Sequence, residues 1–411
     1  MNRRVVITGV GLVTPIGIGV EQSWESVCAG KSGVTEITRF DASAHQTKIA
    51  AEVKGFRAED FIPKKEAKRN ELFISYAMAA TRMALDDAGL EINSKNANRI
   101  GVVTGCGLGG LGIMEDTILA VSTKGPKRVS PFFIPMMIGN MAPGMISIHF
   151  GAKGPNLSIA TACAAGTHAI GDSFKMVQSG TVDAMITGGT EAVVSATAVA
   201  GFNAMKALST RNDEPAKASR PFDRDRDGFI IGEGSGMLII EALDVARERG
   251  AKIYAEIVGY GLTGDGYHMT SPCPDGDGAI RCMQAALDDA AAAPLIFQNL
   301  ESNKWPRLEV IWADSKYHNH ELNGWIEHFQ PTWRLEIISR PPGVQGFTLL
   351  PKRWVAERSF AWNGRCRRHS RDCERRTDSS ESMVRVTAIG LMLRRLAPPD
   401  PPPKFNYRIA A

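Results

Sequence analysis

No stretch of about 18 consecutive apolar residues occurs in this chain, so we expect no membrane-spanning helix. The chain enters a strand-like segment directly after Met1 and Asn2, without the apolar leader of a secretory signal peptide, which favours a cytoplasmic location. Cysteine is scarce, with seven residues in the chain. They are scattered, and none forms a Cys-x-x-Cys pair. This usage excludes a disulfide framework and a zinc site, and it fits a reducing compartment.

Charge and residue usage change near residue 294. Residues 295–411 carry 19 Lys and Arg against 12 Asp and Glu, whereas the whole chain has a formal net charge of only +4. Six of the seven tryptophans lie in this last part, Trp24 being the exception, but only five of the 41 glycines do. A glycine-rich, weakly acidic part is therefore followed by a basic, tryptophan-rich one, which indicates a domain boundary at this point.

One segment, residues 154–177, has the features of a nucleophile site. A short apolar strand, Leu157 to Ala160, is followed by small residues around Cys163 and then by a helical pattern. We therefore expect Cys163 at the start of a helix, where backbone N–H groups and the helix dipole favour an anion and make a thiol more nucleophilic. A buried structural cysteine is the alternative, because cysteine is among the residue types found most often inside proteins.

Strands and helices alternate along the first 250 residues, which predicts a parallel or mixed sheet covered by helices. Strands are expected at 4–9, 100–104 and 183–188 and within 228–241, and helices at 23–29 and 72–88. Gly105, Gly107 and Gly110 match the spacing of a dinucleotide-binding loop, but no clear acidic partner follows them. We interpret this loop as a tight turn and expect no cofactor.

Long motifs in residues 1–292 resemble the β-ketoacyl-acyl-carrier-protein synthases, the condensing enzymes of fatty-acid synthesis, and most closely the type II enzymes. The resemblance begins with RRVVITGVGLVTPIG, the GCGLGGLG loop and TACAAGTHAIG around Cys163. It includes SPFFIPMMIGNMAPG, ITGGTEA, ALSTRND, ASRPFDRDRDGFIIGEGSGMLIIE and AKIYAEIVGYGLTGDGYHMTSP. These motifs follow one another in the family's order and with its spacing.

This resemblance implies an α/β, thiolase-like fold of two similar halves and a homodimer. The first half would be residues 1–250, and a truncated second half would occupy residues 251–293. Cys163 would take an acyl group from acyl-carrier protein, and the carbanion left when malonyl-carrier protein loses CO₂ would then attack the acyl group. The carrier protein is acidic, and the candidate docking residues are Lys64, Lys65, Lys68, Arg69 and Lys206, although a charge run is commonly just a solvated face.

The family's pattern stops after a helix expected at 278–292. One catalytic histidine of the family lies in an Asn-Ala-His-Gly-Thr motif and the other in a Gly-His-x-x-Gly-Ala segment, and neither motif is present. The eight histidines are His45, His149, His168, His268, His318, His320, His328 and His369. Because removing one such donor costs about 10²–10³ in rate, we expect acylation without condensation, or no activity. His168, five residues after Cys163, is interpreted as a packed or solvated residue on a helix face.

Residues 300–397 resemble part of a second family, the insertion-sequence transposases with an Asp-Asp-Glu core on an RNase H-like fold. The resemblance rests on WADSKYHNHEL, GFTLLPKRWVAERSFAWNGRCRRHSRD and IGLMLRRL. It implies that Asp314 and Glu357 correspond to two acidic ligands of Mg²⁺, with Arg353 four residues before Glu357. The first aspartate and the DNA-binding part of that family have no counterpart, so nucleic acid is not the expected partner. The proline-dense residues 398–411 are expected to form a disordered tail.

These features leave three hypotheses open. The chain is a type II condensing enzyme, an inactive or acylation-only fusion left by a mobile element, or a DNA-binding transposase remnant. A fusion that lacks most of its second half would leave strand edges and apolar helix faces uncovered, so we expect poor solubility.

Overall fold

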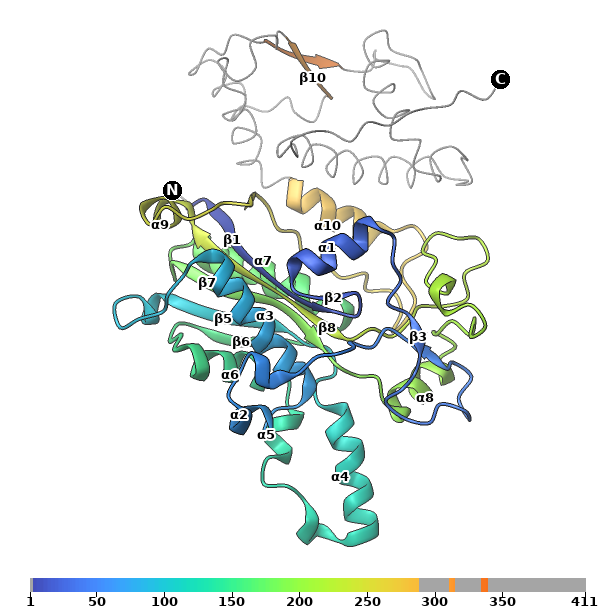
Figure 1. Cartoon of the computed structure of the whole chain (residues 1–411). Helices are drawn as coiled ribbons and strands as arrows, with labels where there is room; N and C mark the ends of the chain where they lie inside the picture. The colour runs from blue at the N-terminus through green and yellow to red at the C-terminus, as the bar shows by residue number, and fades with distance from the viewer. Residues whose placement is uncertain (1–2, 288–309, 315–333, 339–411) are drawn as a thin grey trace. The chain divides into compact units, whose positions relative to one another are not determined.

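The computed structural model describes residues 3–287, 310–314 and 334–338 (Figure 1). The chain divides into two units, Met1–Tyr260 and Gly261–Ala411. The domain boundaries expected from the sequence stay predictions, and the predicted tail at 398–411 lies outside the described residues.

A mixed sheet of seven strands forms the centre of the first unit, in the order β2-β1-β8-β7-β5-β6 with β9 beside β1. These strands are β1 (Val5–Thr14), β2 (Gly17–Ile18), β5 (Ile100–Gly105), β6 (Asn156–Ile159), β7 (Ala184–Glu191), β8 (Gly234–Ala242) and β9 (Ala255–Ile257). β5 pairs in parallel with β6 and β7, whereas β8 is antiparallel to both β1 and β7. The expected mixed sheet is confirmed.

Helices cover both faces of this sheet (Figure 1). Successive strand residues point to opposite faces, so neighbouring residues enter different cores. Val102 and Ile186 lie in the core formed with α3 (Leu72–Ala88) and α6 (Met141–Phe150). Val103 and Met185 lie in the core formed with α7 (Ala165–Gln178). The sheet is thus buried on both sides by apolar contact.

α3 lies unusually close to β1, which follows from the small residues on both elements. A Cβ placed on Gly11 would lie 1.9 Å from the carbonyl oxygen of Ala80, and one on Gly9 would lie 2.2 Å from that of Ala84. The predicted helix at 72–88 has these same bounds in the structure.

The remaining elements of the first unit connect the sheet and the helices α3, α6 and α7. The helices are α1 (Val20–Cys28), α2 (Lys64–Ala67), α4 (Leu111–Lys124), α5 (Phe133–Met137), α8 (Ala196–Ala204) and α9 (Leu243–Glu248). The 3-10 turns are η1 (Ala58–Asp60), η2 (Ala97–Arg99), η3 (Pro126–Arg128), η4 (Ala162–Ala164) and η5 (Pro215–Lys217), and β3 (Thr35–Glu36) pairs with β4 (Ile49–Ala50).

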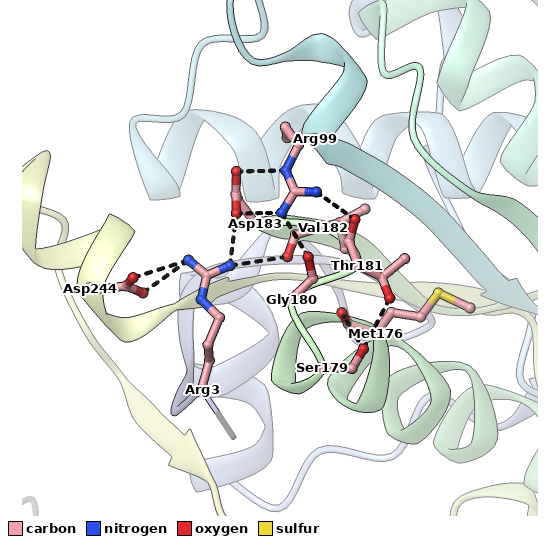
Figure 2. A network of polar contacts seen from close by, with 9 residues as sticks. All are labelled: Arg3, Arg99, Met176, Ser179, Gly180, Thr181, Val182, Asp183 and Asp244. Carbon is pink, nitrogen blue, oxygen red and sulfur yellow. Dashed lines mark hydrogen bonds and ion pairs between the residues drawn. The ribbon is translucent and has the colours of Figure 1, made fainter. Parts of the chain in front are cut away.

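A polar network joins several chain segments just before β5 and β7 begin (Figure 2). Arg99 donates hydrogen bonds to both carboxylate oxygens of Asp183, at 3.0 and 2.9 Å, and to two carbonyls in the turn after α7. Arg3 donates to Asp183 at 2.7 Å and to Asp244 of α9 at 3.1 Å. The hydrogen bonds from Arg99 and Arg3 lower the pKa of Asp183 to about 2. This network fixes the α7–β7 connection to the rest of the sheet.

The segment 111–137, which contains α4 and α5, is here called the α4–α5 arm. Neither helix has a buried residue, and α4 extends away from the sheet (Figure 1). Ile118, Leu119 and Ile134 on the arm are exposed, as is Leu157 on the edge strand β6. An apolar arm and a sheet edge are therefore uncovered in the described part of the chain.

The second unit is described in three segments. Residues 261–276 form a loop that precedes α10 (Asp277–Leu287), which corresponds to the helix expected at 278–292 as far as it is described. β10 (Val310–Asp314) and β11 (Arg334–Ile338) pair in parallel. The RNase H-like fold stays a prediction. Within the described ranges, no helix is long and apolar enough to cross a membrane.

Candidate active site

Three neighbouring parallel strands, β7, β5 and β6, end at the same edge of the sheet. β6 leads into the turn that carries Cys163, β5 leads into the glycine-rich loop 106–110, and β7 ends at Glu191. In open α/β sheets, ligands bind outside the carboxyl ends of the strands. The nucleophile predicted from the sequence therefore lies at the edge where this architecture builds sites.

Cys163 lies in the 3-10 turn η4, between β6 and α7. The preceding residue, Ala162, has a φ of 50°, a left-handed conformation that is unfavourable for a residue with a Cβ. The thiol is exposed and is followed two residues later by the first residue of α7. The predicted strand, turn and helix around Cys163 are confirmed, and the alternative of a buried structural cysteine is wrong.

Glycines allow the start of α7 to lie directly against the strand ends. A Cβ placed on Gly105 would lie 2.2 Å from the carbonyl carbon of Ala165, and one on Gly166 would lie 3.4 Å from the Cα of Gly189. A larger residue at Gly105 would push the first turn of α7 away from β5. The position of Cys163 thus depends on backbone-to-backbone packing beneath it.

Tyr260 packs on α7, and His168 lies within this helix, five residues after Cys163. A Cβ placed on Gly171 of α7 would lie 2.1 Å from the Tyr260 ring, so this ring lies directly on the helix backbone. The ring centroids of His168 and Tyr260 are 6.5 Å apart, and His168 Nδ1 lies 2.7 Å from the hydroxyl oxygen of Thr161. His168 therefore contacts the residue two positions before Cys163 and is half-buried on α7, in agreement with its interpretation as a packed or solvated residue on a helix face.

Glu191 is a site residue that the sequence analysis did not single out. Its carboxylate accepts hydrogen bonds from the backbone N–H groups of Gly107, Leu108 and Gly109, at 2.8, 2.9 and 3.1 Å. Cys106 is buried beside it and donates its S–H to Glu191 at 3.5 Å. Burial, together with this carboxylate, raises the pKa of the Cys106 thiol, which makes Cys106 a poor nucleophile.

The predicted docking residues fall into two groups. Lys64, Lys65, Lys68 and Arg69 lie within and directly after α2, and all four are exposed. The Arg69 guanidinium lies over the ring of Phe132, 4.8 Å from its centroid. Lys206 is also exposed but lies on a different element, after α8. The structure therefore brings the first four together.

The residues considered for the second family lie largely outside the described chain. Asp314 is the last residue of β10, whereas Glu357 and Arg353 lie outside the described residues. Across the described ranges, no group of three His, Cys, Asp or Glu residues could hold a metal ion. His268 Nδ1 accepts backbone N–H groups of its own loop at 3.1 Å, which indicates a structural role.

Comparison with protein families gives two matches. Residues 2–246 match the beta-ketoacyl synthase N-terminal domain, and residues 266–392 match the transposase DDE domain. The chain is 53% identical over 302 residues to 3-oxoacyl-[acyl-carrier-protein] synthase 2 of Staphylococcus aureus strain COL, which covers 74% of this chain and 73% of that protein. It is 51% identical over 289 residues to the same-named protein of Vibrio cholerae, which covers 70% of each.

Solved structures show the same fold. A beta-ketoacyl synthase from Burkholderia phymatum is 31% identical, with a TM-score of 0.65 over 82% of this chain and 80% of that one. The ketosynthase of a type II polyketide system, solved with its acyl-carrier protein, is 28% identical, with a TM-score of 0.64 over 82% and 81%. The first unit thus has the α/β thiolase-like fold. The chain belongs to the beta-ketoacyl synthase family, and its ketosynthase N-terminal domain is followed by a transposase DDE domain.

Proposed function

We propose that Cys163 accepts an acyl group from acyl-carrier protein, which is the first half of the reaction of a 3-oxoacyl-[acyl-carrier-protein] synthase II. The observation that carries this proposal is the exposed thiol of Cys163 in the strained turn at the start of α7. Such a position stabilises a thiolate through helix N–H groups and leaves it open to a thioester.

The acyl transfer needs only this nucleophile and donors for the oxyanion. The Cys163 thiolate attacks the carbonyl carbon of the acyl thioester, and a new C–S bond forms. Backbone N–H groups in the first turn of a helix have no partner within the helix and can stabilise the negative oxygen of the tetrahedral intermediate. The bond to the carrier sulfur then breaks, and the carrier leaves as a thiolate that takes a proton from water, which balances the proton released when Cys163 ionised.

We further propose that condensation with malonyl-carrier protein does not follow. Condensation in this family uses two histidines that polarise the malonyl carbonyl, and neither sequence context is present in this chain. The other described histidines are engaged elsewhere: His45 contacts the carbonyl of Ala196, and His149 contacts Glu66 and Arg82. The expected loss is about 10²–10³ in rate for each missing donor.

Acyl-carrier protein is the proposed partner. The exposed Lys64, Lys65, Lys68 and Arg69 form one basic surface, and Lys206 supplies a second basic point. Acidic partners are attracted to such surfaces, which raises the rate of encounter more than the final affinity. The polyketide ketosynthase with a related fold was solved in complex with its acyl-carrier protein.

We propose a cytoplasmic homodimer as the assembly state. The edge strand β6 and the α4–α5 arm both present uncovered apolar residues. Pairing of two β6 edges would satisfy the open backbone groups of each, and the arm could cover apolar surface of a second copy.

The transposase DDE match supports a second candidate, in which residues 266–392 retain affinity for DNA. Duplex binding by a basic segment weakens steeply as the salt concentration rises. Measuring duplex binding between about 50 and 200 mM salt tests this candidate. The junction of the two matches also supports a fusion left by a mobile element. An undisturbed gene whose full-length product complements loss of the synthase would argue against that origin.

The deciding experiment offers acyl-carrier protein and then malonyl-carrier protein to the purified full-length chain. We expect a thioester on Cys163, seen by mass spectrometry, and no 3-oxoacyl product. Cys163→Ala should form no thioester, and Cys28→Ala, which removes another exposed thiol, is the matched control. Full turnover would overturn the proposal that condensation does not follow, and absence of the thioester would overturn the proposed acylation of Cys163.

A further inference from the structure

Glu191 lies at the end of β7, next to β5, which leads into the glycine-rich loop, and β5 lies between β7 and the strand β6 that leads into the Cys163 turn. One carboxylate there accepts three consecutive backbone N–H groups, from Gly107, Leu108 and Gly109. Hydrogen bonds to a charged acceptor are stronger than those between neutral groups. The loop 106–110, which follows β5 in the chain, is therefore bound to the end of β7 by hydrogen bonds to a charged acceptor.

The same loop lies against the turn that carries the nucleophile. A Cβ placed on Gly107 would lie 3.7 Å from the Cα of Ala162, the strained residue before Cys163. The backbone N–H of Cys106 donates to the carbonyl of Ile159, the last residue of β6, at 3.0 Å. Contacts therefore run from Glu191 through the loop to both ends of the short segment 159–162.

The arm holds the opposite side of this loop. The N–H of Gly110 donates to the carbonyl of Met137 at 2.9 Å, and a Cβ on Gly109 would lie 2.9 Å from that same oxygen. Gly109 also has a φ of 68°, a conformation that suits glycine. The loop is held between the end of α5 and the Glu191 carboxylate, so it has little freedom to move away from the nucleophile turn.

We propose that Glu191 is a positioning residue that keeps the 106–110 loop against the Cys163 turn and so holds the thiol at the start of α7. This inference rests on the proposed acyl transfer for its purpose but not for its test. Without the clamp, the loop can withdraw and Ala162 can relax out of its left-handed conformation. The thiol then leaves its position at the start of α7.

The proposal makes a prediction opposite in sign to a simple charge effect. If Glu191 acted only as a nearby negative charge, removing that charge would favour the thiolate and speed its reactions. If it acts by position, Glu191→Gln slows them, because the amide can accept fewer of the three N–H groups and places its own N–H against the rest.

The test follows alkylation of Cys163 by iodoacetamide in the full-length chain, with peptide mass spectrometry to count Cys163 alone. We expect Glu191→Gln to slow alkylation at least fivefold at pH 7. Gly109→Ala, which disturbs the same loop without removing the charge, should slow it similarly. Glu52→Gln is the matched control, because Glu52 is a buried carboxylate that also accepts two backbone N–H groups, from Thr38 and Arg39.

Thermal melting of each variant separates positioning from general loss of structure. A Glu52→Gln variant that is destabilised as much as Glu191→Gln, yet alkylates at the wild-type rate, would support the proposal. Equal or faster alkylation in Glu191→Gln would overturn it, as would equal slowing in the Glu52→Gln control. Failure of the wild-type chain to accept an acyl group counts against the proposed function alone, because alkylation requires no carrier protein.

Discussion

At the scale of single residues, the site depends on glycines, which have no Cβ and so allow close backbone packing. Gly105 is the clearest case, because its Cα faces the backbone of Ala165 at the start of α7. The left-handed Ala162 is the opposite case, since its backbone conformation would suit glycine better. The close packing beneath the turn and its strained backbone together determine where Cys163 lies.

Substitution of Gly105 by alanine should be costly. The added Cβ would lie 2.2 Å from a carbonyl carbon, so the start of α7 must move, and we expect a loss of about 2–4 kcal/mol in unfolding free energy. The matched control is Gly201→Ala in α8, where nothing lies within 4 Å of the new Cβ. That change should stabilise the chain by about 0.5–1 kcal/mol. Denaturant titration of both variants measures the contrast, and equal effects would contradict this account.

The sequence was sufficient to predict the strand, turn and helix around Cys163, because small residues after an apolar run are compatible with few other local structures. It was not sufficient to predict the role of Glu191. The groups that Glu191 contacts, Gly107 to Gly109, lie more than 80 positions earlier in the chain and come beside it only because β5 and β7 pair in parallel. A carboxylate at the end of a strand, just after two glycines, was the available signal, but it does not reveal the partner.

At the scale of elements, the Arg3, Arg99 and Asp183 network binds the α7–β7 connection at the end of α7 opposite to Cys163 (Figure 2). The pKa of Asp183 is about 2 in the folded chain, below the value of about 3.9 expected when unfolded. The folded state therefore binds this proton less readily, and the carboxylate stabilises folding above about pH 4. That stabilisation is lost as the pH falls from about 4 to about 2.

Replacement of Asp183 by asparagine should remove this dependence. We expect a loss of about 2 kcal/mol at neutral pH and a much smaller loss near pH 2, because wild-type Asp183 is then protonated as well. Asp225→Asn, which removes an exposed partner of Arg224, should change little at either pH. Unfolding curves at the two pH values test this, and a pH-independent loss in Asp183→Asn would be inconsistent with the linkage.

The element pattern was predictable where the periodicity was strong, as in α3 and β5, and less so in the arm. α4 begins after two glycines and carries apolar residues such as Ile113, Ile118 and Val121 with no single polar face. Sequence periodicity identifies a helix by its contrast between faces. A helix that has no buried face in its own chain lacks that contrast.

The edge strand β6 should take part in the proposed dimer. Leu157→Arg places a charge on the exposed edge, and we expect the dimer to weaken by at least about tenfold, because charged edge residues oppose edge-to-edge pairing. Val27→Arg on α1 is the control, since Val27 is similarly exposed but lies on another element. Sedimentation velocity over a range of concentrations gives the dissociation constants. Equal constants for both variants would place the interface elsewhere.

At the scale of the whole molecule, the chain joins parts of two families that have no functional relation. The ketosynthase part contains the proposed nucleophile Cys163, the sheet beneath it and the basic surface around α2, whereas the histidine motifs of the family are absent from the sequence. The composition change near residue 294 predicts a junction there, because basic, tryptophan-rich sequence replaces glycine-rich sequence. The precise boundary is harder to infer, since the transposase match begins at residue 266, before the composition changes.

Poor solubility is the expected outcome for the full-length chain. Apolar residues of the arm and the β6 edge are exposed together, and contiguous apolar surface promotes association. We expect most of the expressed chain in the insoluble fraction, with size-exclusion chromatography of the remainder showing aggregates beside dimer. A monodisperse dimer in high yield, with one cooperative melting transition, would contradict this expectation.

The contact between Tyr260 and Gly171 sets a minimum length for any shortened version of the ketosynthase part. The Tyr260 ring fills the space over the middle of α7, at Gly171, where a Cβ would collide with it. A chain that ended before residue 260 would leave the space over Gly171 of α7 empty, whereas a chain that keeps Tyr260 fills it. The last residue of the first unit therefore fills this space, and we expect its removal to disturb α7 as far as the end that carries the proposed nucleophile.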